Sequence, residues 1–376
     1  MRTAICDELG IEFPLFAFSH CRDVVAAVTN AGGFGVLGAL AFEAERLEVE
    51  LDWVDQHVGG RPYGVDFAMP ATYVGKGGGE EASPERLLAA IPTEHREFVS
   101  RLLDDAGIAP LPDDLERAAP KATGLNVDDE GPGQVEVTLA HPGVKMIVNA
   151  LGPPPEYDIE RAHAQGVLVG ALAGARQHAE RQVAMGVDVV IAQGTEAGGH
   201  CGEISTMVLV PQIVDAVGDR AHVLAAGGIA DGRQMAAAMA LGAQGVWCGS
   251  VWLLTSEADV YPEVTQNLIE ATSRDAVRSR AMTGKPARQL RTAWTTAWER
   301  PDAPAPLPMP LQGLLYGEAA ARFSRVHSKE FGGYPCGQIV GSLDRLRPAK
   351  QVVLEMVEGW IDTVQGLGGL LESDAR

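Results

Sequence analysis

The chain has 376 residues, of which 46% are hydrophobic, so it can bury a sizeable core and is not expected to be disordered. It carries 30 Lys and Arg residues against 50 Asp and Glu residues, and this net charge of −20 argues against binding to nucleic acids or to anionic membranes. Its five cysteines are scattered and lack CxxC spacing, which favours reduced thiols over disulfides or structural zinc. The N-terminal segment lacks the apolar core of a signal peptide, and we expect a cytoplasmic protein.

Eight short apolar runs recur along the chain and predict strands. They are Phe13–Ala17, Phe34–Leu37, Tyr63–Phe67, Val144–Asn149, Val167–Gly170, Val187–Ile191, His222–Ala226 and Gly245–Cys248. Most are continuously apolar rather than alternating, which is typical of parallel strands covered on both faces. Eight strands in succession favour a closed (β/α)8 TIM barrel in the α/β class, and an open doubly wound sheet is the alternative.

Several predicted strands are followed by the pattern of an amphipathic helix. After the second strand, four apolar residues from Leu47 to Val58 fall on one helical face. After the seventh strand, Asp231 is placed to cap a helix. The chain closes with a further amphipathic helix that begins at about Pro348.

Residues 71–141, between the third and fourth strands, interrupt this alternation. The segment is rich in glycine and acidic residues, and it holds helix-like stretches over Pro84–Ala90 and Glu94–Asp105. It is much longer than the usual connection in an α/β unit. We therefore expect a lid or a side elaboration of the barrel here.

A second long segment, Ser256–Pro310, follows the eighth strand and ends in the proline-rich sequence PDAPAPLPMP. It is predicted to form a small, mostly helical insertion over the barrel mouth, where it would contact substrate. The expected organisation is therefore a barrel domain made of residues 1–255 and 311–376, with residues 256–310 inserted between its two parts.

The sequence VDVVIAQGTEAGGHCG (Val187–Gly202) joins a buried strand to a polar, glycine-rich loop. Active sites of α/β barrels lie at the carboxyl ends of the strands. His200 follows two glycines in this loop, and an imidazole with an ordinary pKa near 6.5 exchanges protons near neutral pH. We predict His200 as the catalytic residue, and His20, after the first strand, is the alternative.

Glycine-containing loops follow the seventh and eighth strands, in AAGGIADGRQ and GVWCGS. They place Gly227 and Gly228 after one strand and Gly249 and Ser250 after the next. In barrels these two loops commonly bind phosphate through backbone N–H groups and helix dipoles. The sequence therefore predicts a phosphate site, although two adjacent glycines can also serve only to make a tight turn.

Taken together, AQGTEAGGHCG, LAAGGIADG and GVWCGS resemble the nitronate monooxygenase family, formerly called 2-nitropropane dioxygenases. Further matches occur in order over most of the chain outside residues 71–141: VTNAGGFGVLGAL, TGKPAR, PMPLQGLL and GQIVGSLDRLRPA. The resemblance implies a TIM barrel that binds flavin mononucleotide (FMN). It also implies oxidation of alkyl nitronates, and of nitroalkanes as a further substrate class, by dioxygen to a carbonyl compound and nitrite.

Residue by residue, the resemblance places His200 at the family's active-site histidine. It implies that FMN is contacted by Asp66, Gln193, Gly198, Gly228, Trp247, Cys248, Gly249 and Ser250, and it implies no metal. Asp66 stands where many members have an asparagine near the flavin ring. The segment FAFSH (Phe16–His20) replaces a more usual alanine-proline-methionine segment.

Two alternative functions remain open at this point, and a homodimer is a further expectation. Related barrels with the same EAGGH loop include NADH:quinone reductases and flavin-dependent enoyl reductases. No nicotinamide fingerprint of the GxGxxG kind sits in a βαβ context in this sequence, which favours the nitronate oxidase. A barrel that only binds a phosphate-bearing ligand is the alternative from another class, and its function would not depend on His200.

Overall fold

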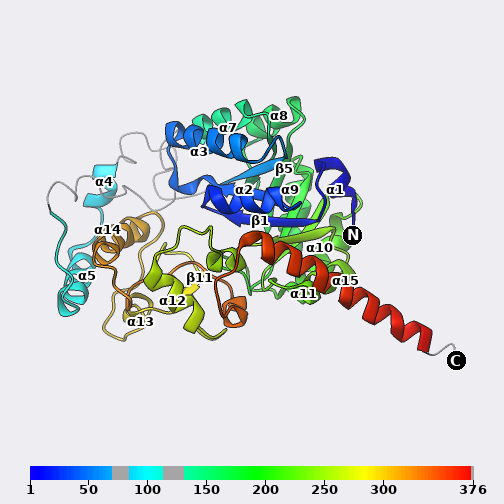
Figure 1. The fold of residues 1–376 in the computed structure, drawn as a ribbon. Helices are drawn as coiled ribbons and strands as arrows, with labels where there is room; N and C mark the ends of the chain where they lie inside the picture. Colours follow the sequence, from blue (N-terminus) through cyan, green and yellow to red (C-terminus); the bar gives the residue numbers. More distant parts are fainter. Residues whose placement is uncertain (70–83, 113–130, 374–376) are drawn as a thin grey trace.

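The computed structural model describes residues 1–69, 84–112 and 131–373, and eight parallel strands form a closed barrel (Figure 1). The barrel strands are β1 (Leu15–Ser19), β2 (Phe34–Gly38), β3 (Tyr63–Phe67), β4 (Val144–Asn149), β5 (Leu168–Ala173), β6 (Val189–Gln193), β8 (His222–Ala226) and β9 (Gly245–Cys248). They are adjacent in this order, and β9 pairs back onto β1. The predicted (β/α)8 fold is confirmed, and the open-sheet alternative is wrong.

The first predicted strand is displaced by two residues in the structure. The N–H of Phe13 donates to the carbonyl of Gly32 outside the ladder, and Pro14 has no N–H to donate. Pairing with β2 therefore begins at Phe16, opposite Phe34. Apolar composition marked the buried run correctly, but backbone hydrogen bonds set the ends of the strand.

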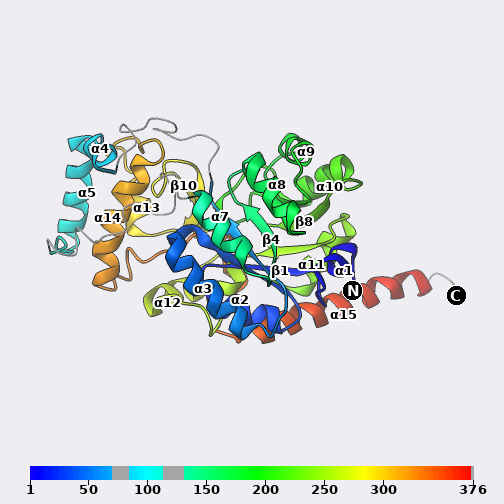
Figure 2. The same cartoon turned by 90° about the horizontal axis from the view of Figure 1, so that it is seen from above.

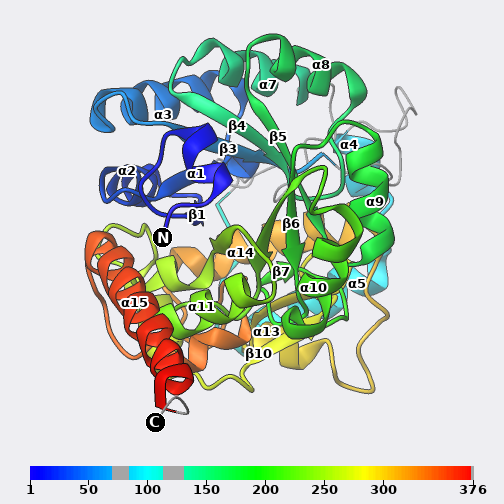
Figure 3. The ribbon, with the colours of Figure 1, turned by 90° about the vertical axis from the view of Figure 1, so that its right-hand side faces the viewer.

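Helices surround the barrel in Figure 3. They are α2 (Arg22–Asn30), α3 (Ala44–His57), α7 (Gly131–Ala140), α8 (Glu156–Ala164), α9 (Arg176–Ala184), α10 (Thr206–Val217) and α11 (Gly232–Ala240), with the short η1 (Ala39–Ala41) after β2. The stripe predicted after the second strand is the buried face of α3. Asp231 caps α11 as predicted, and its side chain accepts a hydrogen bond from the Gln234 N–H in a capping box.

Alternation along the strands divides the side chains into two layers. The interior layer consists of Phe16, Phe34, Val36, Met146, Val148, Val189, Ile191, Leu224, Ala226 and Trp247. Apolar residues of α1 (Ala4–Leu9) pack with this layer, whereas the alternate strand residues face the surrounding helices. The barrel is thus a filled core with its polar residues concentrated at one end.

A second hydrophobic core lies beside the barrel, where α4, α5, α13 and α14 gather (Figure 2). These helices are α4 (Pro84–Ala89), α5 (Thr93–Asp105), α13 (Ala293–Ala297) and α14 (Leu311–Arg325), and the first two match helices predicted from the sequence. Buried Arg322 donates to the carbonyl oxygens of Ile108 and Ala109 and so connects α14 to the segment after α5. The second core therefore joins the 71–141 segment to residues on both sides of Pro310.

The segment 256–310 contains strands as well as the helices that were expected. Its elements are α12 (Pro262–Glu270), β10 (Ala276–Ser279), β11 (Ala287–Leu290) and α13, and the short η3 (Ser250–Leu254) precedes them. β11 pairs antiparallel with β10 on one side and with β7 (Gly199–His200) on the other. A two-residue strand has no sequence periodicity, so this pairing could not be predicted from hydrophobic pattern.

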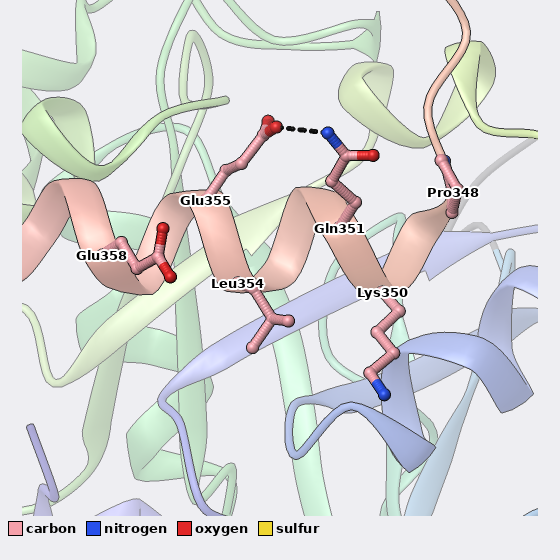
Figure 4. A pocket seen from close by; sticks show the side chains of 6 residues that line it. All are labelled: Pro348, Lys350, Gln351, Leu354, Glu355 and Glu358. Carbon is pink, nitrogen blue, oxygen red and sulfur yellow. Dashed lines mark hydrogen bonds between the residues drawn. The ribbon is translucent and has the colours of Figure 1, made fainter.

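The chain ends in α15 (Ala349–Ser373), which follows η4 (Gln338–Ser342) and extends beyond the barrel (Figures 1 and 3). Its outer face carries an open groove of about 430 Å³ that includes Lys350, Leu354 and Glu358 (Figure 4). Leu370 and Leu371, near its end, are largely exposed. Among the described residues, no helix combines the length and the apolar character needed to cross a bilayer.

Candidate functional site

The carboxyl ends of the barrel strands bring together inward-facing side chains from distant parts of the sequence. Gly64 of β3 faces the interior residues Phe34 and Val36. Asp66, two residues later on the same strand, therefore also faces the barrel interior and is the last residue of β3 to do so. Gln193 ends the inward row of β6 and lies in register with Ala226 of β8. These positions make the carboxyl end the polar end of the barrel interior.

Asp66 is only 4% exposed, and its Oδ1 atom has no hydrogen-bond partner among the described residues. Burial raises the pKa of this carboxyl well above its ordinary value. A protonated carboxyl has one O–H donor and one carbonyl acceptor, the same pair of functions as an amide. Asp66 can therefore offer a ligand both a donor and an acceptor without placing a negative charge at the mouth.

Aromatic rings line the mouth on the β1 and β9 side. Phe18 and Trp247 stack with their centroids 6.2 Å apart, and the edge of His20 packs against Phe18 at 5.1 Å. The Nδ1 atom of His20 lies 3.0 Å from the carbonyl oxygen of Gly38, and burial lowers the pKa of this imidazole. His20 is thus a neutral ring held by the backbone next to the aromatic wall.

Four backbone N–H groups lie in the two loops after β8 and β9. Gly227 and Gly228 adopt φ values of 105° and 72°, which disfavour residues with a side chain. The N–H groups of Gly227, Gly228, Gly249 and Ser250 have no acceptor in the part of the chain that the structure describes. Unpaired N–H groups in two neighbouring loops form a suitable cradle for an anion such as a phosphate.

The two residues before this cradle point in opposite directions. Trp247 belongs to the barrel interior, whereas Cys248 packs in the outer layer between strands and helices. Burial raises the pKa of the Cys248 thiol to about 12, and its carbonyl oxygen accepts a hydrogen bond from the indole of Trp252 at 2.7 Å. Any contact of Cys248 with a ligand at the mouth would therefore come from its backbone.

Gly198 lies where the loop after β6 crosses the segment before η4. A Cβ atom on Gly198 would come within 2.8 Å of the Cys336 backbone. The N–H of Gly337 donates to the Ser250 hydroxyl at 2.7 Å, and the N–H of Gln338 donates to the Glu196 carbonyl at 2.9 Å. This close crossing holds the loop after β6 against the phosphate cradle.

Glu196 joins the same loop to α10. Its carboxylate accepts hydrogen bonds from the backbone N–H and the hydroxyl of Thr206, at 3.0 and 2.9 Å. An acidic side chain at a helix N-terminus is favoured by the helix dipole. The Thr206 hydroxyl also lies 3.0 Å from the Gly227 carbonyl, so this contact connects the loops after β6 and β8.

His200 lies on β7, opposite Ala287 of β11. Its Nε2 atom is 2.8 Å from the hydroxyl oxygen of Thr283, in the turn between β10 and β11. Burial, together with the positive charge of nearby Lys285, lowers the pKa of His200 to about 4. The imidazole is therefore neutral near pH 7.

Three further residues that support the site were not singled out from the sequence. Asn149, at the end of β4, is fully buried and bonds both the N–H and the carbonyl of Met69. Buried Arg288 donates to the carbonyl of Thr195, and Thr283 contacts His200. The motif TGKPAR marked the last two as part of a resemblance, but nothing in it indicated their partners.

Three kinds of group at the barrel mouth could hold an organic cofactor. The cradle offers N–H groups to a phosphate, Asp66 offers an Oδ1 atom without a partner, and Phe18 and Trp247 supply aromatic surface. Within the described residues, no group of three or more His, Cys, Asp and Glu side chains is placed to hold a metal ion. The fold and the site together are those of a TIM-barrel enzyme with an organic cofactor.

A model of the nitronate monooxygenase family matches residues 3–359, and the chain belongs to this family. A Mycobacterium tuberculosis protein named as a monooxygenase, Rv1533, is 55% identical over 99% of this chain and all of its own length. A Staphylococcus saprophyticus protein named as a nitronate monooxygenase is 29% identical, and the alignment covers 77% of this chain and 79% of that protein.

Two solved structures resemble the whole chain. Nitroalkane oxidase from Streptomyces ansochromogenes has a TM-score of 0.79 and 25% identity, with 97% of this chain and all of that chain covered. FabK from Thermotoga maritima has a TM-score of 0.73 and 26% identity, with 98% and 99% covered. The chain is thus a flavin-dependent oxidoreductase on a TIM barrel, and the non-catalytic alternative is wrong.

Proposed function

We propose that this chain binds FMN and oxidises alkyl nitronates with dioxygen, giving a carbonyl compound and nitrite. The family match and the similarity to a nitroalkane oxidase support the reaction type. The structural observation that carries the proposal is the neutral His200 on a loop that packs directly against the phosphate cradle. The loop that carries His200 approaches the cradle at Gly228, where an added Cβ atom would lie 3.3 Å from the Cβ of Glu196.

The residues predicted to contact FMN have complementary roles in this proposal. The N–H groups of Gly228, Gly249 and Ser250 would hold its phosphate, and the Ser250 hydroxyl, which accepts from Gly337, keeps its own proton free to donate. Asp66 and Gln193 would meet polar atoms of the ring system. The bound flavin supplies the electron transfer between substrate and dioxygen, and the protein supplies binding and orientation.

His200 would act on the substrate as a neutral group. A neutral imidazole accepts a proton, so it can remove the α-proton of a nitroalkane and extend the substrate range beyond preformed nitronates. With a pKa of about 4 it does not offer a lasting positive charge to an anion near pH 7. Of the two roles, general base or cation that binds an anion, we propose the base.

Reduction of a quinone or an enoyl substrate by NAD(P)H is the second candidate. The comparable similarity to FabK favours it, because that structure covers almost the same share of the chain as the nitroalkane oxidase. Both candidates use the same cradle and the same histidine. They differ in the molecule that reduces the flavin.

Two measurements on the purified protein test these proposals. The chromophore released on denaturation should be FMN by chromatography. On anaerobic mixing, propyl-2-nitronate should reduce the bound flavin faster than NADH does. Reduction by NADH and not by the nitronate would replace the leading proposal with the reductase.

The substitution His200→Asn tests the catalytic role. We expect nitroalkane turnover to fall by roughly 10²- to 10⁴-fold, the usual contribution of a general base, with the flavin still bound. The matched control is His178→Asn, which changes an exposed histidine on α9. Full turnover in His200→Asn would rule out His200 as the base.

The division into a barrel and an inserted 256–310 segment that contacts substrate is also part of the proposal. Pairing of β11 with β7 supports it, because this segment then reaches the loop that carries His200. The homodimer stays a prediction, which light scattering on the holoprotein would test.

A further inference from the structure

We propose that Thr283 is a positioning residue for His200: its hydroxyl accepts the Nε2 hydrogen of the imidazole and leaves the Nδ1 lone pair to receive the substrate proton. The identity of the proton donor, a nitroalkane, rests on the proposed function. The proposed imidazole tautomer does not, because it concerns contacts within the chain and can be measured without any substrate.

The direction of the hydrogen bond depends on where the hydroxyl hydrogen of Thr283 points. Its hydroxyl oxygen lies 2.8 Å from Nε2 of His200 and 3.3 Å from the carbonyl oxygen of Lys285, and it accepts a hydrogen bond from the Lys285 N–H at 3.4 Å. A hydroxyl has one hydrogen to donate, and a carbonyl oxygen can only accept. When the Thr283 hydrogen points at the Lys285 carbonyl, its oxygen can interact with His200 only as an acceptor, so Nε2 carries the hydrogen.

The turn that holds Thr283 is fixed at several points. Gly284 has a φ of 82°, and a Cβ atom there would lie 2.1 Å from the Leu307 carbonyl oxygen, so the turn packs closely on the segment before α14. Arg280 donates from Nε to the carbonyl of Gly284 at 2.9 Å. Pairing of Ala287 with His200 fixes the position of the turn along β7 and therefore relative to the imidazole. Thr283 is therefore held in place rather than adapting to the ring.

The charges around His200 favour the neutral ring that this arrangement needs. Lys285 lies on the same turn, and its positive charge opposes protonation of the imidazole. Arg288 follows Ala287 on β11, and its guanidinium donates to the carbonyls of Thr195 and Ala276. The two cations are brought to β7 by the TGKPAR motif, together with Thr283. No anionic side chain is among the groups that shift the pKa of His200 in the described structure.

The proposed step balances in protons and electrons. The C–H bond at the α-carbon of the nitroalkane breaks, its proton forms an N–H bond at Nδ1, and its electron pair stays on the substrate as the nitronate. The resulting imidazolium still donates its Nε2 hydrogen to Thr283. The ring therefore gains and returns a proton at Nδ1, while the hydrogen on Nε2 stays bonded to Thr283.

The test compares Thr283→Val with Thr283→Ser in the FMN-loaded protein. Imidazole ¹⁵N NMR should show the hydrogen of His200 on Nε2 in the unmodified protein and in Thr283→Ser, and a mixture of tautomers in Thr283→Val. Turnover of a neutral nitroalkane should fall by about 10- to 100-fold in Thr283→Val, as for a misplaced catalytic group, and recover in Thr283→Ser. Oxidation of a preformed nitronate needs no proton removal and should change by less than about threefold by the same reasoning.

Thr363→Val, which makes the same substitution on α15, is the matched control and should leave the spectrum and the kinetics unchanged. Lys285→Met should raise the pKa of His200 measured in the same NMR titration, without changing the tautomer. The proposal is overturned if the unmodified protein carries the hydrogen on Nδ1, or if Thr283→Val keeps the original tautomer. Should the protein oxidise neither nitro substrate, the proposed function fails, but the NMR result still decides the role of Thr283.

Discussion

Three titratable side chains at the barrel mouth are shifted toward their neutral forms. Burial raises the pKa of Asp66 and lowers the pKa values of His20 and His200. Burial penalises whichever form is charged, so an acid and a base move in opposite directions. The chain as a whole carries a net charge of −20. Because Asp66 is neutral, it does not add to this charge at the mouth, where it would repel an anionic substrate.

Asp66→Asn is expected to stabilise the flavin-free protein, and more so at higher pH. The folded-state pKa lies above the ordinary value of 3.8, so the stability that Asp66 contributes is complete below 3.8 and is lost as pH rises through the folded-state pKa. Each unit of the shift corresponds to about 1.4 kcal/mol. Urea unfolding at pH 5 and pH 8 should show a larger gain for Asp66→Asn at pH 8.

Asp105→Asn provides the control for this experiment, because Asp105 is exposed near the end of α5. Its effect on the free energy of unfolding should be the same at both pH values. An equal gain at the two pH values for Asp66→Asn would mean that Asp66 is charged in the folded protein.

The sequence singled out His200 as a candidate, but it did not indicate which residue forms a hydrogen bond with its imidazole. His200 follows a buried strand in a glycine-rich loop, which is a local pattern. Thr283 lies 83 residues away and reaches His200 only through pairing of β11 with β7. That contact depends on a two-residue strand and on the path of the whole insertion, and neither leaves a periodic pattern.

At the scale of elements, α15 crosses the N-terminus of α11 in close contact. A Cβ atom on Gly232 would lie 2.1 Å from the Trp360 nitrogen and 2.5 Å from the Met356 carbonyl oxygen. Both partners are backbone atoms, which cannot move away as a side chain can. Only a glycine at the start of α11 allows the two helices to approach this closely.

Gly232→Ala should therefore lower the free energy of unfolding by about 1–3 kcal/mol, because an added carbon in a packed contact forces a backbone shift. Gly366→Ala is the contrasting variant, since Gly366 lies in α15 with nothing within 4 Å of an added Cβ. It should stabilise the protein by up to about 1 kcal/mol through helix propensity. Thermal unfolding measures both, and equal effects would contradict the close crossing.

Strand positions were predicted more accurately than strand ends. The bounds of β3, β4, β8 and β9 agree with those expected, whereas β5 and β6 each run further toward the barrel mouth. Gln193 belongs to β6 because its neighbour Gly194 still donates to the Ala226 carbonyl. This hydrogen bond joins two segments that are distant in the sequence. The hydrophobic pattern of one segment alone therefore cannot predict where the strand ends.

At the scale of the whole molecule, the second core depends on a buried cation. Arg322 is 7% exposed and donates to the carbonyls of Ile108 and Ala109, with Asp104 at 3.3 Å. Removing it leaves the buried Ile108 carbonyl without this partner, which is costly. The segment from α4 to Ala109 would then lose a main attachment to α14.

Arg322→Ala should increase proteolytic cleavage within residues 84–112 by opening the second core, while the barrel keeps its far-UV circular dichroism. Arg325→Ala changes an exposed arginine on the same helix and should be cleaved like the unmodified protein. Loss of barrel structure in Arg322→Ala would show that the two cores do not unfold separately.

The pairing of β7 with β11 also constrains how this enzyme can be redesigned. The strand that carries His200 pairs with β11, which belongs to a hairpin encoded some 80 residues later. A transplant of the glycine-rich loop alone into another barrel would leave the histidine without its scaffold. The loop and the hairpin have to be inherited, exchanged or engineered as one piece.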